Sequence, residues 1–121
     1  MNIEEFRDYC LSKKGVTESF PFDEFTLVFK VMNKMFALTS VRGDFSINLK
    51  CDPEEAIRLR EEFPAVIPGY HMSKKHWNTV AIDGSITDDK LYKWIDGSYD
   101  LIVESLPRKL KDQLEQLNEK Q

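Results

Sequence analysis

Apolar and polar residues alternate over residues 25–31 and again over 45–49, and a third largely apolar stretch, 35–41, lies between them. A period of two is typical of strands that have one face buried in a sheet. The three stretches are joined by short turns at 32–34 and 42–44. Together they predict an antiparallel meander of three strands.

A helical pattern precedes the meander. Asn2 is followed three residues later by Glu5, which forms a capping box, and Ile3, Phe6 and Cys10 fall on one helical face. We expect this first helix to run to Lys14, and Gly15 supplies the stop.

A second helix is predicted immediately after the meander. Asp52 offers a side-chain cap, and Pro53 suits the first helical position. Two glutamates follow at the positive end of the helix dipole. We expect this helix to end near Glu62, and a fourth strand is expected over residues 77–82.

The last third of the chain is predicted to be helical. Thr87, followed by two aspartates, starts one helix, which we expect to be interrupted at Gly97. Pro107 opens a last helix with a stripe of leucines. The predicted element order is therefore α-β-β-β-α-β-α-α. It describes an α+β fold with an antiparallel sheet of four to five strands and helices mainly on one face.

The composition is that of a soluble globular protein, with 41% hydrophobic and 31% charged residues among 121. This length predicts one domain over residues 1–121. No apolar run approaches the roughly 20 residues that span a bilayer, and the chain start lacks a signal-peptide pattern. We therefore expect a cytoplasmic protein without membrane association.

Cys10 and Cys51 lie 41 residues apart, without the spacing of a redox dithiol or a zinc site. Cys51 precedes a helix start, where the dipole lowers a thiol pKa, but Asp52 opposes that effect. We expect reduced thiols that serve packing, with no cofactor and no metal.

Charge separates the predicted strands from the predicted helices. Residues 25–51 carry four basic groups against one carboxylate, and 63–82 carry two lysines without a carboxylate. The segments 1–24, 52–62 and 83–121 each carry three more carboxylates than basic groups. The sequence thus predicts a positive sheet side, which can attract an anionic polymer despite the net charge of −4. The alternative is that lysine protects strand edges and glutamate favours helices, with no ligand involved.

Three motifs resemble the MmcQ/YjbR family of small bacterial proteins, and the resemblance spans essentially the whole chain. They are LKCDPE at 49–54, PGYHMSKKHWNTV at 68–80 and SYDL at 98–101, with Ser73 in a place where the family motif has asparagine. The resemblance implies a compact fold with an antiparallel sheet, similar to the CyaY (frataxin-like) arrangement. It also implies a non-enzymatic protein with a proposed role in DNA binding.

The candidate DNA contacts come from the 68–79 segment and from the strands. Lysines would meet phosphates, histidines would donate hydrogen bonds and aromatic rings would stack on exposed bases. These residues are Lys30, Arg42, Lys50, Tyr70, His71, Lys74, Lys75, His76, Trp77 and Asn78.

Packing is the competing explanation for Tyr70 and Trp77, since large aromatic residues are mostly buried. If Val80 and Ile82 point inward, Asn78 shares their face and Trp77 points outward. Strand phase therefore decides the role of Trp77.

Other functions are weighed beside DNA binding. A protein-interaction module would use the same 68–79 segment as its contact surface. A frataxin-like fold also raises iron binding through Glu4, Glu5 and Asp8, although the helix dipole explains these carboxylates more simply.

Catalysis would need a nucleophile with a base. His71 or His76 could supply the base and Cys51 or Ser98 the nucleophile, but no spacing signature joins them. We therefore expect no catalytic residues.

Overall fold

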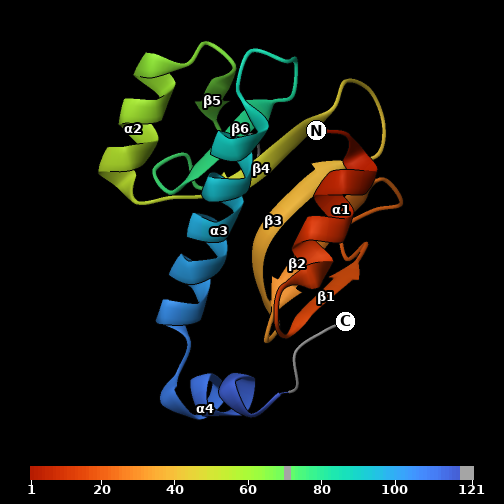
Figure 1. Ribbon diagram of the computed structural model, residues 1–121, viewed down its shortest axis with the longest axis vertical. Helices are drawn as coiled ribbons and strands as arrows, with labels where there is room; N and C mark the ends of the chain where they lie inside the picture. The colour runs from red at the N-terminus through yellow and green to blue at the C-terminus, as the bar shows by residue number, and fades with distance from the viewer. Residues whose placement is uncertain (70–71, 118–121) are drawn as a thin grey trace.

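A computed structural model describes residues 1–69 and 72–117. The chain forms four helices and one sheet within these ranges (Figure 1). In chain order the elements are α1 (Ile3–Ser12), β1 (Val16–Ser19), β2 (Thr26–Val31), β3 (Lys34–Ser40), β4 (Ser46–Lys50), α2 (Pro53–Glu62), β5 (Val66–Pro68), β6 (Trp77–Ala81), α3 (Asp88–Ser105) and α4 (Arg108–Gln116).

The sheet has the strand order β1-β2-β3-β4-β6-β5, and all neighbouring strands are antiparallel. The predicted α+β class and the β2–β3–β4 meander are confirmed. The prediction of four to five strands is wrong, because the sheet has six among the described residues. The two additional strands, β1 and β5, are short edge strands of four and three residues, too short to show a clear period.

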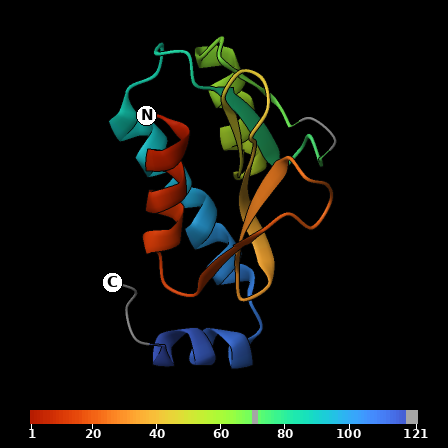
Figure 2. The same ribbon diagram turned by 90° about the vertical axis from the view of Figure 1, so that its right-hand side faces the viewer.

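The helices cover one face of this sheet. Figure 2 shows α1 and α3 on the same side of the strands. The main core lies between these layers and includes Phe6 of α1, Leu59 of α2, Ile95 of α3 and Leu114 of α4. Strand residues that alternate toward the helices complete it. The opposite face is called the helix-free face below.

Helix ends follow the predicted capping in part. The Asn2–Glu5 capping box is present, and the Thr87 side chain accepts a hydrogen bond from the backbone N–H of Lys90. Asp52 lies at the start of α2 but makes no side-chain cap. Pro53 has no N–H group that would need a cap, and the two glutamates face the positive end of the helix dipole. The start of α2 is therefore stable without a side-chain cap.

The predicted interruption at Gly97 is wrong, since α3 runs without a break from Asp88 to Ser105. Tertiary packing of Ile95, Ser98 and Ile102 outweighs the low helix propensity of a single glycine. Within the described residues, no helix combines the length and the apolar character that crossing a membrane requires.

Candidate binding surface on the helix-free face

Trp77 points to the helix-free face. In the β4–β6 ladder Trp77 lies opposite Lys50, while Asn78 lies opposite Leu49. Residues directly opposite each other share a face, and Leu49 belongs to the main core. The strand phase that the sequence left open is therefore the one in which Trp77 points away from the helices.

Pointing away from the helices does not leave Trp77 exposed. Its side chain is only 8% exposed and forms a second apolar cluster with Val28 and Leu38. Met35 and Met72 pack against this cluster. The indole thus covers central strands of the sheet, and packing is the role that the structure gives to Trp77.

The start of the 68–79 segment holds Trp77 in place. The backbone N–H of Gly69 donates a hydrogen bond of 2.8 Å to the carbonyl oxygen of Trp77. A Cβ atom at Gly69 would lie 2.8 Å from the Trp77 Cβ and 3.0 Å from its carbonyl oxygen. Only glycine permits this close approach.

Two lysines of the candidate set lie on the helix-free face. Lys50 is opposite Trp77, and Lys30 is opposite Met35, which packs in the same cluster. Because β2 and β4 flank β3, the two lysine backbones are separated by two strand spacings, about 10 Å. The apolar cluster is therefore bordered by two cations.

Residues 73–76 form a turn that adds charge at the same end of the sheet. The N–H groups of His76 and Trp77 donate to the Ser73 carbonyl oxygen, at 3.1 and 2.9 Å. Lys74 and Lys75 are exposed, and His76 is half-buried. The turn leads directly into β6, so its lysines lie near the Lys50 end of β4.

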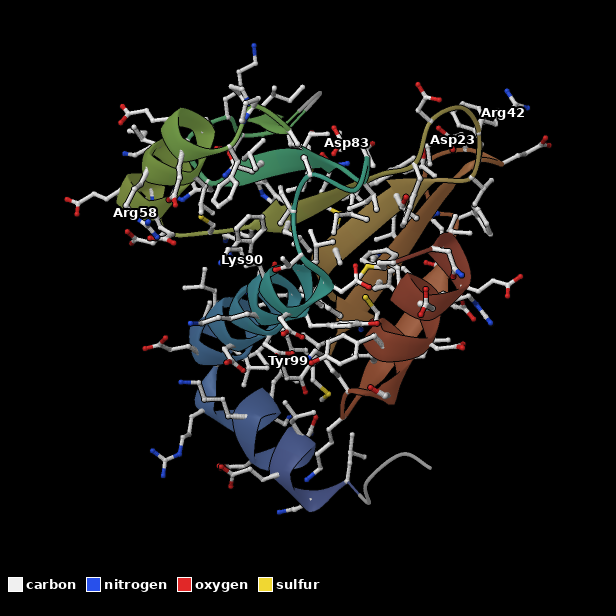
Figure 3. The ribbon with its side chains drawn as sticks, turned by 45° about the horizontal axis from the view of Figure 1, so that its top comes forward. Asp23, Arg42, Arg58, Asp83, Lys90 and Tyr99 are labelled. Carbon is white, nitrogen blue, oxygen red and sulfur yellow. The ribbon has the colours of Figure 1, made fainter. Side chains whose placement is uncertain are left out.

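Arg42 is not part of this group. It lies in the turn between β3 and β4, at the other end of β4 from Lys50 and about 16 Å away along the strand. Its guanidinium carbon stands 4.3 Å from the centre of the Phe25 ring, and it lies beside Asp23 (Figure 3). Burial raises the pKa of Asp23, but hydrogen bonds from Phe25 and Thr26, together with the charge of Arg42, outweigh it and lower the pKa below its usual value. The Asp23 carboxylate thus offsets the positive charge of Arg42.

Asn78 lies on the opposite side of the sheet from Lys30 and Lys50. The prediction that it contacts DNA together with the lysines is therefore wrong. It is 2% exposed, and its amide group donates to the Ala56 carbonyl oxygen of α2. Its Oδ1 accepts a hydrogen bond of 2.6 Å from Nε of Arg60. The amide is therefore used inside the protein and is not available to a ligand on the helix-free face.

Arg60 is a positioning residue that the sequence reasoning missed. Besides Asn78, its guanidinium donates to the Lys74 carbonyl oxygen, which ties the 73–76 turn to α2. A signal was present, because Arg60 falls on the same helical stripe as Ala56, Leu59 and Phe63. A cation on a buried stripe indicates a structural hydrogen-bonding role.

Tyr70 and His71 fall outside the described residues, so their predicted contacts stay predictions. Among the described residues, no group of three or more His, Cys, Asp or Glu side chains is arranged to hold a metal ion.

Neither candidate nucleophile is activated: the Ser98 hydroxyl is used in hydrogen bonds within the protein, and the Cys51 thiol is protonated. The Ser98 hydroxyl donates to the Phe36 carbonyl oxygen at 2.5 Å and accepts from the Lys50 N–H at 2.9 Å. Burial, with Glu55 and Asp52 nearby, raises the pKa of the Cys51 thiol to about 11. Burial also raises the pKa of Cys10. Both thiols are neutral at physiological pH, as expected for packing roles.

The most similar proteins that a sequence comparison finds include members of the family that the three motifs indicate. It is 36% identical over 118 residues to the uncharacterized protein YjbR of Escherichia coli K12, covering 97% of this chain and all of that one. It is 26% identical over 114 residues to the uncharacterized protein YyaQ of Bacillus subtilis, covering 81% of this chain and 95% of that one.

Solved structures share the fold. A crystal structure of a Deinococcus radiodurans protein superposes with a TM-score of 0.89 at 36% identity, over 99% of this chain and 91% of that one. A crystal structure of a Pseudomonas syringae protein gives 0.73 at 30% identity, over 84% and 98%. The YjbR family profile matches residues 11–101. The chain therefore belongs to the YjbR family.

Proposed function

We propose that this protein is a non-enzymatic, cytoplasmic DNA-binding protein that holds the phosphate backbone at one end of its helix-free face. The four lysines that would make the contacts are Lys30, Lys50, Lys74 and Lys75. A CyaY-like arrangement is part of the proposal, and an antiparallel sheet with helices on one face supports it.

The observation that carries the proposal is the distribution of charge on the helix-free face. By strand register, Lys30 and Lys50 face the same side, and the exposed Lys74 and Lys75 precede β6 at that end. Within the described strands, no carboxylate alternates onto this face. Local positive charge attracts an anionic polymer even when the whole chain is acidic.

The geometry also limits the mode of binding. Trp77 is 8% exposed, so it cannot stack on bases without leaving the apolar cluster. Contacts through four lysines supply affinity without base readout. We expect dissociation constants of roughly 10⁻⁴ to 10⁻⁶ M at physiological salt, which is the range of non-specific binding.

A fluorescence-anisotropy titration of duplex and single-stranded DNA at several salt concentrations tests this proposal. The double variant Lys74→Ala/Lys75→Ala should weaken binding at low salt and make the salt slope about two units shallower. The matched control, Lys109→Ala/Lys111→Ala on α4, removes the same charge elsewhere and should leave the slope unchanged. Binding that ignores salt, or that both double variants weaken equally, would overturn the proposal.

Protein binding is the second candidate, and one observation favours it. Phe20, Phe22 and Val41 are 48%, 68% and 48% exposed. The β1–β2 loop and the β3–β4 turn that carry them lie side by side, because the Val41 N–H donates to the Phe25 carbonyl oxygen at 2.8 Å. Asp23 and Arg42 mark the two segments in Figure 3. Exposed apolar groups of this size mark contact surfaces. A nuclease-resistant partner that a Phe22→Ser variant fails to capture would support this alternative.

A further inference from the structure

A pocket of about 490 Å³ opens on the helix side of the sheet, between α2 and α3 and above β4 and β6. It opens on the other side of the strands from the candidate DNA surface, and Lys50 is the one lysine of that surface that also lines the pocket. Its size falls within the range of small-molecule sites. Part of its lining is apolar and comes from the sheet and from α3, with Leu49, Val80 and Leu101 among the lining residues.

The two helices give the pocket walls of opposite charge. Asp52, Glu55 and Glu62 line it from the α2 side, and one guanidinium, Arg58, bridges the two glutamates at 2.5 and 3.2 Å. Three carboxylates against one guanidinium leave this wall with two negative charges.

The α3 wall is positive. Lys90 and Lys93 line it without a lining carboxylate from the same helix. Neither lysine forms an ion pair within the described part of the chain. Figure 3 shows Arg58 on α2 and Lys90 on α3 on facing sides of the space between the helices.

Aromatic rings and open space lie between these walls. Phe63 and Trp94 line the pocket and meet edge to face, with ring centroids 5.3 Å apart. Gly97 also lines it, and a Cβ atom placed there would meet nothing within 4 Å. The pocket is therefore hollow next to α3 and can accept an apolar group against the two rings.

From this arrangement we propose that the pocket binds a small zwitterion with an apolar or aromatic body, of which an aromatic amino acid is the simplest example. The ligand carboxylate lies toward Lys90 and Lys93, and its ammonium lies toward Glu55 and Glu62. Its ring packs near Trp94. The wall charges are partly exposed, so each contributes modestly and the dissociation constant is about 0.1 to 1 mM.

Three probes separate the contributions of the two walls. L-Phenylalanine carries both charges, 3-phenylpropionate lacks the ammonium and phenethylamine lacks the carboxylate. Amide chemical shifts of ¹⁵N-labelled protein, followed at Cys51, Gly97 and Ser98, report both the affinity and the site. We expect L-phenylalanine to bind tightest, and each single-charge analogue to bind up to about fivefold more weakly.

Two variants and a control test the site. Lys90→Gln/Lys93→Gln should weaken L-phenylalanine and 3-phenylpropionate but not phenethylamine. Gly97→Leu fills the hollow and should weaken all three probes, while Lys109→Gln/Lys111→Gln should change none. Equal affinity for the three probes, shifts elsewhere on the protein, or no saturable shift at 10 mM L-phenylalanine would overturn the proposal.

Discussion

Gly69 and Gly97 show how the same residue type serves opposite purposes at two positions. Gly69 lies where β5 approaches the backbone of Trp77 so closely that a Cβ atom would stand 2.8 Å from the Trp77 Cβ. Gly97 lies inside α3 beside open space. The first is required by packing, and the second costs helix stability.

Substituting alanine at each position should therefore have effects of opposite sign. Gly69→Ala should lower the free energy of unfolding by about 1–3 kcal/mol, because Trp77 must shift. Gly97→Ala should raise it by about 0.5–1 kcal/mol, because alanine favours the helix and nothing obstructs its methyl group. Urea denaturation of both variants measures the pair, and a stabilised Gly69→Ala protein would contradict the close approach.

Cys51 should be a slow nucleophile. Burial raises its pKa from 9.0 to about 11, with Glu55 and Asp52 adding to the effect. At pH 8 it then holds about a hundredfold less thiolate than a thiol of pKa 9. Because the folded pKa lies above the unfolded one, this group stabilises the fold fully below pH 9 and loses that contribution as pH rises toward 11.

Mass spectrometry of iodoacetamide alkylation tests this value. The rate at Cys51 should climb with pH through the alkaline range, and Glu55→Gln should accelerate it because a neighbouring negative charge is removed. Cys10 is fully buried and serves as the internal control. Rapid alkylation at pH 7 would instead mean that the thiol has a lowered pKa.

At the scale of elements, the sequence predicts long periodic segments well and short or irregular ones poorly. The alternation at Phe29, Ile47 and Leu49 found the central strands, because those side chains enter the core. β5 was missed because it has three residues and ends in a proline. Lys30 and Lys50 share one face of the sheet. Arg42 was grouped with them by charge alone, although the predicted meander places the 42–44 turn at the other end of β4 from Lys50.

One guanidinium of α2 adds to the hydrogen bond that the Asn78 amide of β6 donates to the Ala56 carbonyl oxygen. Arg60 donates to Asn78 Oδ1 and to the Lys74 carbonyl oxygen, so it joins the helix to the turn that carries the candidate DNA-binding lysines. Arg60→Lys keeps the charge but loses the fork of donors. We expect it to lower the free energy of unfolding by about 1–3 kcal/mol, because a buried amide oxygen loses its partner.

Arg58→Lys is the matched control for that experiment. Arg58 lies on the same helix, pairs only with exposed glutamates among the described residues and has a side chain that is 59% exposed. Its replacement should leave the urea midpoint unchanged. If neither substitution lowered stability, the positive charge alone would suffice at position 60, and the proposed role of the guanidinium fork would be wrong.

On the scale of the whole molecule, the sheet separates two surfaces with different chemistry. The helix side holds the main core and the pocket between α2 and α3, whereas the other side holds the smaller Trp77 cluster and the lysines. The net charge of −4 conceals this division. Segment charges indicated a positive sheet side, but the pocket could not be predicted, because its walls come from α2 and α3, which β5 and β6 separate in the sequence and whose distance in space depends on packing.

The C-terminal helix is the part of the molecule that should open most easily. α4 extends below the rest of the protein in Figure 1 and buries one of its residues, Leu114, whereas α3 buries four. Leu114 packs near Gly15, where a Cβ atom would lie 2.5 Å from the leucine Cδ1. A nine-residue helix has little stability of its own in water, so its folding depends mainly on Leu114, with Leu110 packed partly against the same core.

Leu114→Ala should therefore release α4 without unfolding the sheet. In native-state hydrogen exchange, the amides of α4 should lose their protection in this variant, while those around Ile95 in α3 keep theirs. Ile95→Ala, at a fully buried position, should instead lower the free energy of unfolding by about 2–5 kcal/mol and reduce protection in both helices. If Leu114→Ala lowers protection in α3 and α4 in parallel, then α4 belongs to the same cooperative unit as the sheet, and its single buried leucine contributes to global stability.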